Sequence, residues 1–346
     1  MANPEPPVLR HEVDHEVDPA KLTYTFGGAE AIATLVAGSI LDTSTLDCFA
    51  GRVRSPEDKV TEVCDPRFLN PQTGPFYIEG AEPGDTLAVH FARIEPRRAF
   101  GISTTVPFFG ALTATGFTAM LHGPLPEMTW FYGIDREQRL VRYEARDSDY
   151  RVELPLDPMH GTVGVAPALG EVRSSLAPGD WGGNMDTPEM RAGVTCYLGV
   201  NVPGALFSFG DGHARQGEGE TCGVAVEAAM DSVVVVDLVK GSPTPWPRLE
   251  SDDELMTAGS ARPLEDAFRI AHAQMVHWVV ELTGLSLMDA YQLVTQTVRT
   301  PVANVVDTNY TVVAKLAKAY LPGTTAMRGA HRRLRALGDD YLARRR

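Results

Sequence analysis

Cysteine is scarce in this chain of 346 residues, which has four, at positions 48, 64, 196 and 222. They lie far apart and none forms a Cys-x-x-Cys pair, so the sequence argues against a disulfide framework and against a zinc site built from cysteines. We therefore predict a protein of a reducing compartment, the cytoplasm.

Long apolar runs and excess positive charge are also missing. The net charge is -14 and the pI is about 5.1, which argues against a broad surface for nucleic acid or anionic membrane. No apolar run is long enough to span a bilayer, and residues 1–18 lack the apolar core of a signal peptide. The basic segment 332–346 is predicted to be a solvated helix.

Several catalytic motifs are absent as well. The chain has no Gly-x-Ser-x-Gly, no phosphate-binding Walker sequence and no Gly-x-Gly-x-x-Gly after a strand. Cys48 and Cys222 remain as candidate thiol nucleophiles. Cys222 falls in a predicted apolar strand, where a small buried core residue is the expected role.

Glycine and proline, 32 and 25 residues, divide the first 245 positions into short segments. In 85–94, Leu87, Val89 and Phe91 alternate with Ala88 and His90, which predicts a strand with the first set facing inward. Further predicted strands are 193–202, 205–209, 222–230 and 232–240. Strands at this spacing predict an antiparallel β-sandwich or barrel-like core.

The pattern changes after residue 245. A proline-rich connector leads to a predicted helix over 264–284 that ends at Gly284, and a second helix begins after Ser286 as its N-cap. A strand over 310–318 and a helical tail from Thr324 follow, so the fold is mainly β with an α/β C-terminal portion. The predicted divisions are an N-terminal extension (1–20), a β-rich catalytic core (21–245), an α/β portion packed on the core (246–322) and a basic helical tail (323–346).

One stretch concentrates chemistry-bearing residues: "GDGHARQGEGE" at 210–220 places His213 among Asp211, Glu218 and Glu220. Divalent metals bind histidine nitrogen and carboxylate oxygen, and glycines let the backbone turn tightly enough for side chains to converge. We read it as a loop between two strands. Either it holds a metal or acid–base site, or it is a polar hairpin whose charges face water.

Other polar residues are further candidates. Glu227 lies in the apolar segment "CGVAVEAAM", where a buried charge needs a partner, although an exposed face of an edge strand would also explain it. Glu79 in "GPFYIEGAEPGD" is equally ambiguous, and "GGNMD" contributes Asn184 and Asp186. Asp47 is a fourth candidate. His90, His122 and His160 are weaker candidates, and a structural role is expected for each of them.

The order of four segments resembles the acetamidase/formamidase family: "NPQTGPFYIEGAEPGDTL" (70–87), "GVAP" (164–167), 182–220 and "CGVAVEAAM" (222–230). The resemblance covers about residues 20–320. It implies hydrolysis of small aliphatic amides to a carboxylic acid and ammonia, a mostly β fold, a bound divalent metal with zinc the best candidate, and homo-oligomers.

Carried onto this chain, the motif positions include Asp211 and Gln216 besides the residues above. The resemblance leads us to assign Asp186, His213 and Glu220 as metal ligands, and Glu227, Glu79 and Asn184 as catalytic. We expect a metal-activated water with a carboxylate as general base.

Two alternatives stay open: a metal-free amidase or lactamase with a carboxylate or cysteine nucleophile, and a non-catalytic protein that binds small molecules. The expected partner is a small amide, with no nucleic acid and no membrane.

Overall fold

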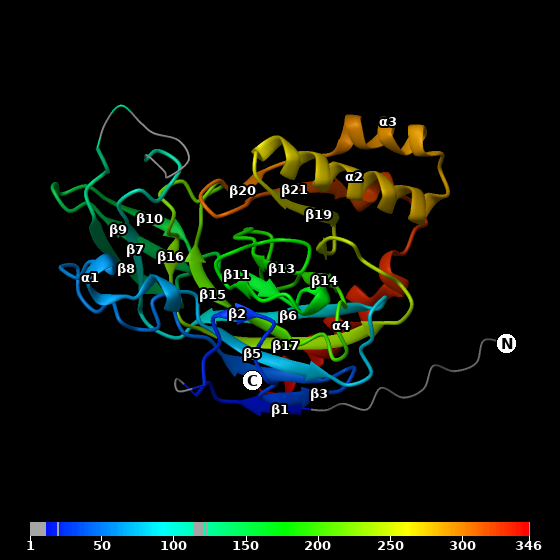
Figure 1. Ribbon diagram of the computed structural model, residues 1–346, viewed down its shortest axis with the longest axis horizontal. Coiled ribbons are helices and arrows are strands. Elements are labelled where there is room, and N and C mark those ends of the chain that lie inside the picture. Colours follow the sequence, from blue (N-terminus) through cyan, green and yellow to red (C-terminus); the bar gives the residue numbers. More distant parts are fainter. Residues whose placement is uncertain (1–11, 19–20, 114–120, 122, 346) are drawn as a thin grey trace.

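Two large β-sheets face each other and helices cover the outer side of one of them (Figure 1). The computed structural model describes residues 12–18, 21–113, 121 and 123–345. His122, one of the weaker candidates, and parts of the N-terminal extension lie outside this range.

The first sheet has nine strands and is antiparallel except where β1 meets β4. In spatial order its strands are β1 (Glu12–His15), β4 (Ile40–Ser44), β17 (Met230–Val239), β6 (Thr86–Pro96), β14 (Thr195–Gly199), β18 (Arg248–Glu250), β19 (Glu254–Ala261), β21 (Tyr310–Ala317) and β20 (Val302–Asn304).

The second sheet is antiparallel except where β3 meets β5. Its main path runs through β10 (Arg151–Pro155), β9 (Leu140–Glu144), β8 (Met128–Asp135), β7 (Phe100–Thr105), β16 (Val226–Glu227), β15 (Phe207–Arg215), β11 (Met159–Gly164) and β13 (Gly182–Asn184). β5 (Gln72–Ile78) pairs with β15 and with β3 (Ala33–Leu35). A separate pair joins β2 (Thr25–Phe26) and β12 (Arg173–Ser174).

The facing sides of the sheets share one hydrophobic core. Val89 and Phe91 of β6 belong to it together with Phe207 and Phe209 of β15. The rings of Phe91 and Phe209 meet edge to face with centroids 6.2 Å apart. The prediction of a mainly β, sandwich-like fold is confirmed, and the sheets do not close into a barrel.

A second core lies between the first sheet and the helices α2 (Leu264–Thr283), α3 (Leu287–Thr297) and α4 (Ala330–Arg344). α2 ends as predicted at Gly284, whose φ of 72° and N–H bond to the Val280 carbonyl form a left-handed C-cap. Ser286 caps α3 as predicted by accepting a hydrogen bond from the Asp289 N–H.

These helices correct one prediction. They also cover the outer face of the first sheet, where Ala88 and His90 of β6 are as buried as Leu87 and Val89. The C-terminal segment is helical but not a solvated tail, since Leu334 and Tyr341 of α4 are buried in the second core. A helix that docks through an apolar stripe leaves only its charged side in water.

Sheet pairing continues across the predicted division at residue 245, because β14 pairs with β18. The four divisions of the chain stay a prediction. Among the residues described, no helix is both long and apolar enough to cross a membrane. The remaining short helices are α1 (Val60–Val63), η1 (Pro66–Phe68), η2 (Ala168–Gly170), η3 (Lys318–Tyr320) and η4 (Ala326–Gly329).

Candidate active site

The segment read as a loop is largely a strand. β15 continues through residue 215, so Asp211 and His213 are two residues apart on one face of a strand. β16 is shorter than predicted and its Glu227 pairs directly with His213. Cys222 precedes this strand and is exposed, which corrects its predicted burial. The loop between β15 and β16 therefore starts only at residue 216 and runs to residue 225.

A neighbouring strand and a second loop complete the group. Asn184 is the last residue of β13, where it pairs with Thr162, and Asp186 follows two residues later. Gly219 forms a bridge with Asn304, which ties the loop carrying Glu220 to the end of β20. Residues distant in sequence thereby converge on His213.

His213 faces three carboxylates with one ring nitrogen. Its Nε2 lies 3.3 Å from Glu227 Oε1, 3.6 Å from Asp211 Oδ1 and 4.0 Å from Asp186 Oδ1. Its Nδ1 lies 2.9 Å from Gln216 Oε1. The Gln216 amide N–H₂ donates to the carbonyls of Asp186 and Ala303, so its oxygen is the atom that accepts from Nδ1–H.

That arrangement orients the ring. A metal-ligating histidine usually donates its second N–H to a fixed acceptor, which sets the tautomer and aims the other nitrogen at the metal. Here Gln216 supplies the acceptor, and Nε2 is the nitrogen aimed at the carboxylates.

Three acids of the site have left-handed backbone conformations, as do nine other non-glycine residues that the structure describes. Asp186, Asp211 and Glu220 have φ angles of 43°, 55° and 46°. These values lie in the left-handed region, which residues other than glycine rarely adopt. Each such residue costs about 1–3 kcal/mol, and such strain clusters at functional sites. Three acidic residues held this way favour a site over a polar turn.

Asn184 holds the acids in position. Its Nδ2 donates to Asp186 Oδ2 at 2.7 Å and to Asp307 Oδ2 at 2.9 Å, while its Oδ1 accepts from Asn70 and from the Thr162 hydroxyl. Both donors and the acceptor of the amide are thus engaged within the protein. These contacts are those of a positioning residue, whereas the sequence predicted a catalytic role for Asn184.

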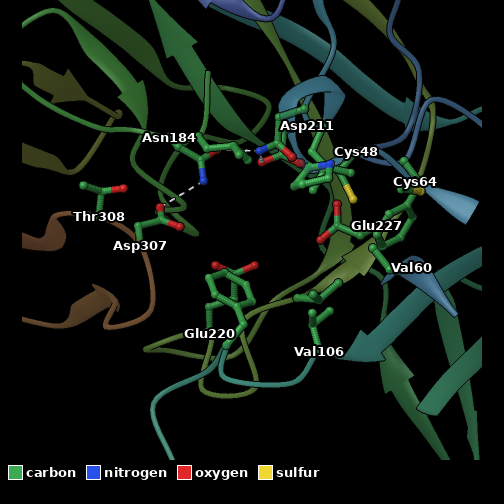
Figure 2. Close-up of a pocket in the computed structure, with 18 of the residues that line it drawn as sticks. Cys48, Val60, Cys64, Val106, Asn184, Asp211, Glu220, Glu227, Asp307 and Thr308 are labelled. Carbon is green, nitrogen blue, oxygen red and sulfur yellow. Dashed lines mark hydrogen bonds between the residues drawn. The ribbon is translucent and has the colours of Figure 1, made fainter. Parts of the chain in front are cut away.

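The group borders a cavity of about 460 Å³. Glu220, Glu227 and Asp307 reach into it from different segments, with Asp211 and Cys48 close by (Figure 2). Much of the remaining wall is apolar, formed by residues such as Phe49, Val60, Leu69, Val106, Phe109, Leu176 and Val224.

Burial dominates the ionisation of these groups. It raises the pKa of Glu227 and of Asp307 to about 7, and raises the pKa of Asp186 and Glu220 well above their usual ranges, with neighbouring carboxylates adding to the effect in each case. For His213 burial alone lowers the pKa, but the facing carboxylates outweigh it and the pKa is raised well above 6.5. Several buried carboxylic acids surround a single histidine. When ionised, they need a cation to balance their negative charge.

The donor set fits a divalent metal ion. One atom each from Asp186, His213 and Glu220 lies within 4.8 Å of the others, and Asp186 Oδ1 and Glu227 Oε2 are buried without a hydrogen-bond partner. Nitrogen plus carboxylate oxygen suits zinc and similar ions. The absence of a side chain at Gly161 of β11 leaves space for these groups, because a Cβ there would lie 2.2 Å from Asp186 Oδ1.

The structure does not bring Glu79 into this group. It follows the last residue of β5, is exposed and lies outside the cavity wall, so the structure gives the predicted catalytic role of Glu79 no support. Asp47 is buried but bonds to Arg98 and to nearby backbone N–H groups. His90 bonds to Thr195 between the first sheet and α4, and His160 bonds to Ser232. These are structural roles.

Sequence reasoning did not name Asn70 or Asp307 as members of the site, and it named Cys48 only as a candidate nucleophile. Asn70 donates to Asp211 Oδ2 at 2.8 Å, and the Cys48 thiol lies within 4.8 Å of carboxylate oxygens of Asp211 and Glu227. A signal did exist for the strand, because Asp211 and His213 continue the alternation of Phe207 and Phe209.

Known proteins share this arrangement of the chain. The structure of an acetamidase from Yersinia enterocolitica is 39% identical, with a TM-score of 0.83, covering 90% of this chain and 93% of that one. The chain belongs to the Acetamidase/Formamidase family. The model of that family matches residues 165–317, which contain Asn184, Asp186, His213, Glu220 and Glu227.

Two further members of the Acetamidase/Formamidase family are similar. An acetamidase from Bacillus halodurans is 31% identical with a TM-score of 0.78, and the match covers 90% of this chain and 98% of that one. The acetamidase of Mycolicibacterium smegmatis is 29% identical over 222 residues, 49% of this chain. The chain spans about half, 53%, of the length of that curated relative.

Proposed function

We propose that this protein is an amidase that hydrolyses the C–N bond of a primary amide to a carboxylate and ammonia, with a divalent metal ion, zinc, as cofactor. The observation that carries the proposal is the aim of His213 Nε2 at three buried carboxylates beside a cavity. Membership of the Acetamidase/Formamidase family supports the reaction class.

Asp186, His213 and Glu220 would hold the ion. When bound, it supplies a Lewis acid that makes water more acidic and polarises a carbonyl group. Gln216 keeps the His213 ring in the tautomer that presents Nε2, and Asn184 fixes Asp186 through the bond to its Oδ2. The other oxygen of Asp186, Oδ1, is thereby left to face His213.

Glu227 is assigned as the general base. Its carboxylate reaches into the cavity, and one of its oxygens has no hydrogen-bond partner. It accepts a proton from water as the water oxygen adds to the amide carbon, and it returns that proton to the nitrogen as the C–N bond breaks. The carboxylic acid and ammonia leave, and the second proton of the water passes between them to give the carboxylate and ammonium.

The decisive experiment measures ammonia release by the purified protein before and after chelation, with elemental analysis of each sample. We expect chelation to abolish activity and added zinc to restore it. Full activity in a sample shown to be free of metal would contradict the metal mechanism and favour a nucleophile in the same cavity.

We also propose a cytoplasmic homo-oligomer. The four cysteines are all free, consistent with a reducing compartment. Phe268, Leu287, Met288 and Tyr291 expose apolar side chains on α2 and α3, which supports the prediction that these helices lie near an interface. A monomeric mass by light scattering at micromolar concentration would contradict the oligomer.

A further inference from the structure

The cavity is much larger than the smallest amides. A molecule with three or four non-hydrogen atoms needs on the order of 100 Å³, taking about 30 Å³ for each as for a water molecule. The cavity measures about 460 Å³. Formamide or acetamide would therefore leave most of it unfilled, whereas cavities of about 300–1,000 Å³ hold considerably larger ligands.

The apolar wall of the cavity begins next to the acids. Figure 2 shows Val60 next to Glu227, with Val106 on the same side of the cavity, away from Asn184 and Asp307. Phe49, Phe109, Leu176 and Val224 add to the apolar wall. An amide group placed against the acids would therefore direct its substituent toward hydrocarbon.

The charges of the wall restrict that substituent further. Among the cavity-lining residues that the structure describes, charged side chains are the acids Asp211, Glu220, Glu227 and Asp307, and none is lysine or arginine. A carboxylate on the substrate would enter an apolar space without a cationic partner, which is costly. The acyl group is therefore uncharged.

We propose that the preferred substrate is a primary amide with a sizeable apolar acyl group, a chain of about six carbons or a phenyl ring, rather than formamide or acetamide. The inference rests on the proposed amidase function and adds the specificity of its cavity. Val60, Val106 and the other apolar residues of the wall are its specificity-determining residues.

The test compares kcat/KM for acetamide, hexanamide, 2-phenylacetamide and the anionic succinamate with the metal-loaded wild-type protein. Each buried methylene contributes about fourfold and hexanamide has four more than acetamide, so hexanamide should exceed acetamide by about 250-fold, and succinamate should be the poorest substrate. Acetamide equal to or better than hexanamide would overturn the specificity and leave the amidase function standing. Absence of ammonia from every amide would overturn both.

Two valine-to-phenylalanine variants distinguish the effect of the cavity wall on specificity from the general effect of a larger side chain. Val106→Phe fills part of the cavity, and we expect the ratio of kcat/KM for hexanamide to that for acetamide to fall at least tenfold. Val63→Phe makes the same change on α1, at a side chain that is 36% exposed and outside the cavity wall, and should leave the ratio within twofold. An unchanged ratio in a folded Val106→Phe protein refutes the assignment, and the wild-type comparison decides the proposal if that variant does not fold.

Discussion

Replacement of Gly161 by alanine tests the geometry of the site without removing any of its functional groups. An alanine Cβ at this position in β11 would lie 2.2 Å from Asp186 Oδ1, 2.7 Å from Asp211 Oδ2 and 3.0 Å from His213 Cε1. Ordinary contact begins at 3.4 Å, so the Asp186 carboxylate has to move by more than 1 Å. The backbone itself accepts alanine, since Gly161 is not among the residues with positive φ.

The Gly161→Ala substitution should lower activity strongly and leave the protein folded. Overpacking of this kind costs about 1–3 kcal/mol, less than the 5–15 kcal/mol by which most domains are stable, so we expect a folded protein. A displacement of about 1 Å at a catalytic centre costs about 100-fold in rate. We therefore expect kcat/KM for the best amide to fall at least 100-fold, together with the amount of bound metal.

The matched control is Gly133→Ala in β8, also a strand glycine without positive φ. Its new Cβ would meet the Cβ of Arg142 at 3.8 Å, an ordinary contact. Amidase assays, elemental analysis and thermal unfolding are measured on both variants, and Gly133→Ala should match the wild type in all three. Wild-type kcat/KM and metal content in Gly161→Ala would refute the view that Asp186 and Asp211 must keep their present positions.

Two further substitutions address individual groups. His213→Ala should remain folded and lose both the bound metal and about 1,000-fold in kcat/KM, because the ligand nitrogen is gone. His90→Ala, which removes a buried histidine of the first sheet, should lower thermal stability and keep activity within about threefold; equal activity losses in both would place the site elsewhere. Cys48→Ala should retain activity within about tenfold, since burial with Glu227 and Asp211 raises the pKa of the thiol well above its usual range and disfavours the thiolate. Complete loss in Cys48→Ala with metal still bound would support the cysteine nucleophile.

The sequence by itself determined the type of most elements and the segments that carry the chemistry. Periodicity and capping found β6, α2 and α3, because those signals are local: an apolar repeat, Gly284 at a helix end and Ser286 at a helix start. The motif around His213 was also visible, since acids, histidine and glycine lie within eleven residues.

Only the tertiary structure decided which of those residues meet. Asp307 reaches the site across 123 residues through its bond to Asn184, and Asn70 across 141 residues through its bond to Asp211. Glu79 shows the reverse, because its motif predicted a catalytic role and the fold leaves it exposed at the end of β5. Strand pairing and loop bridging set these distances, and the pattern along one strand does not specify which strand lies beside it.

The same reason explains the changes of role. Asn184 could not be known as a positioning residue until its amide partners were placed on other segments. Ala88 and His90 alternate with apolar residues as an exposed face would, yet the helices cover them. The local sequence fixes the chemical groups that a side chain offers, and the elements packed around it determine its burial and its partners.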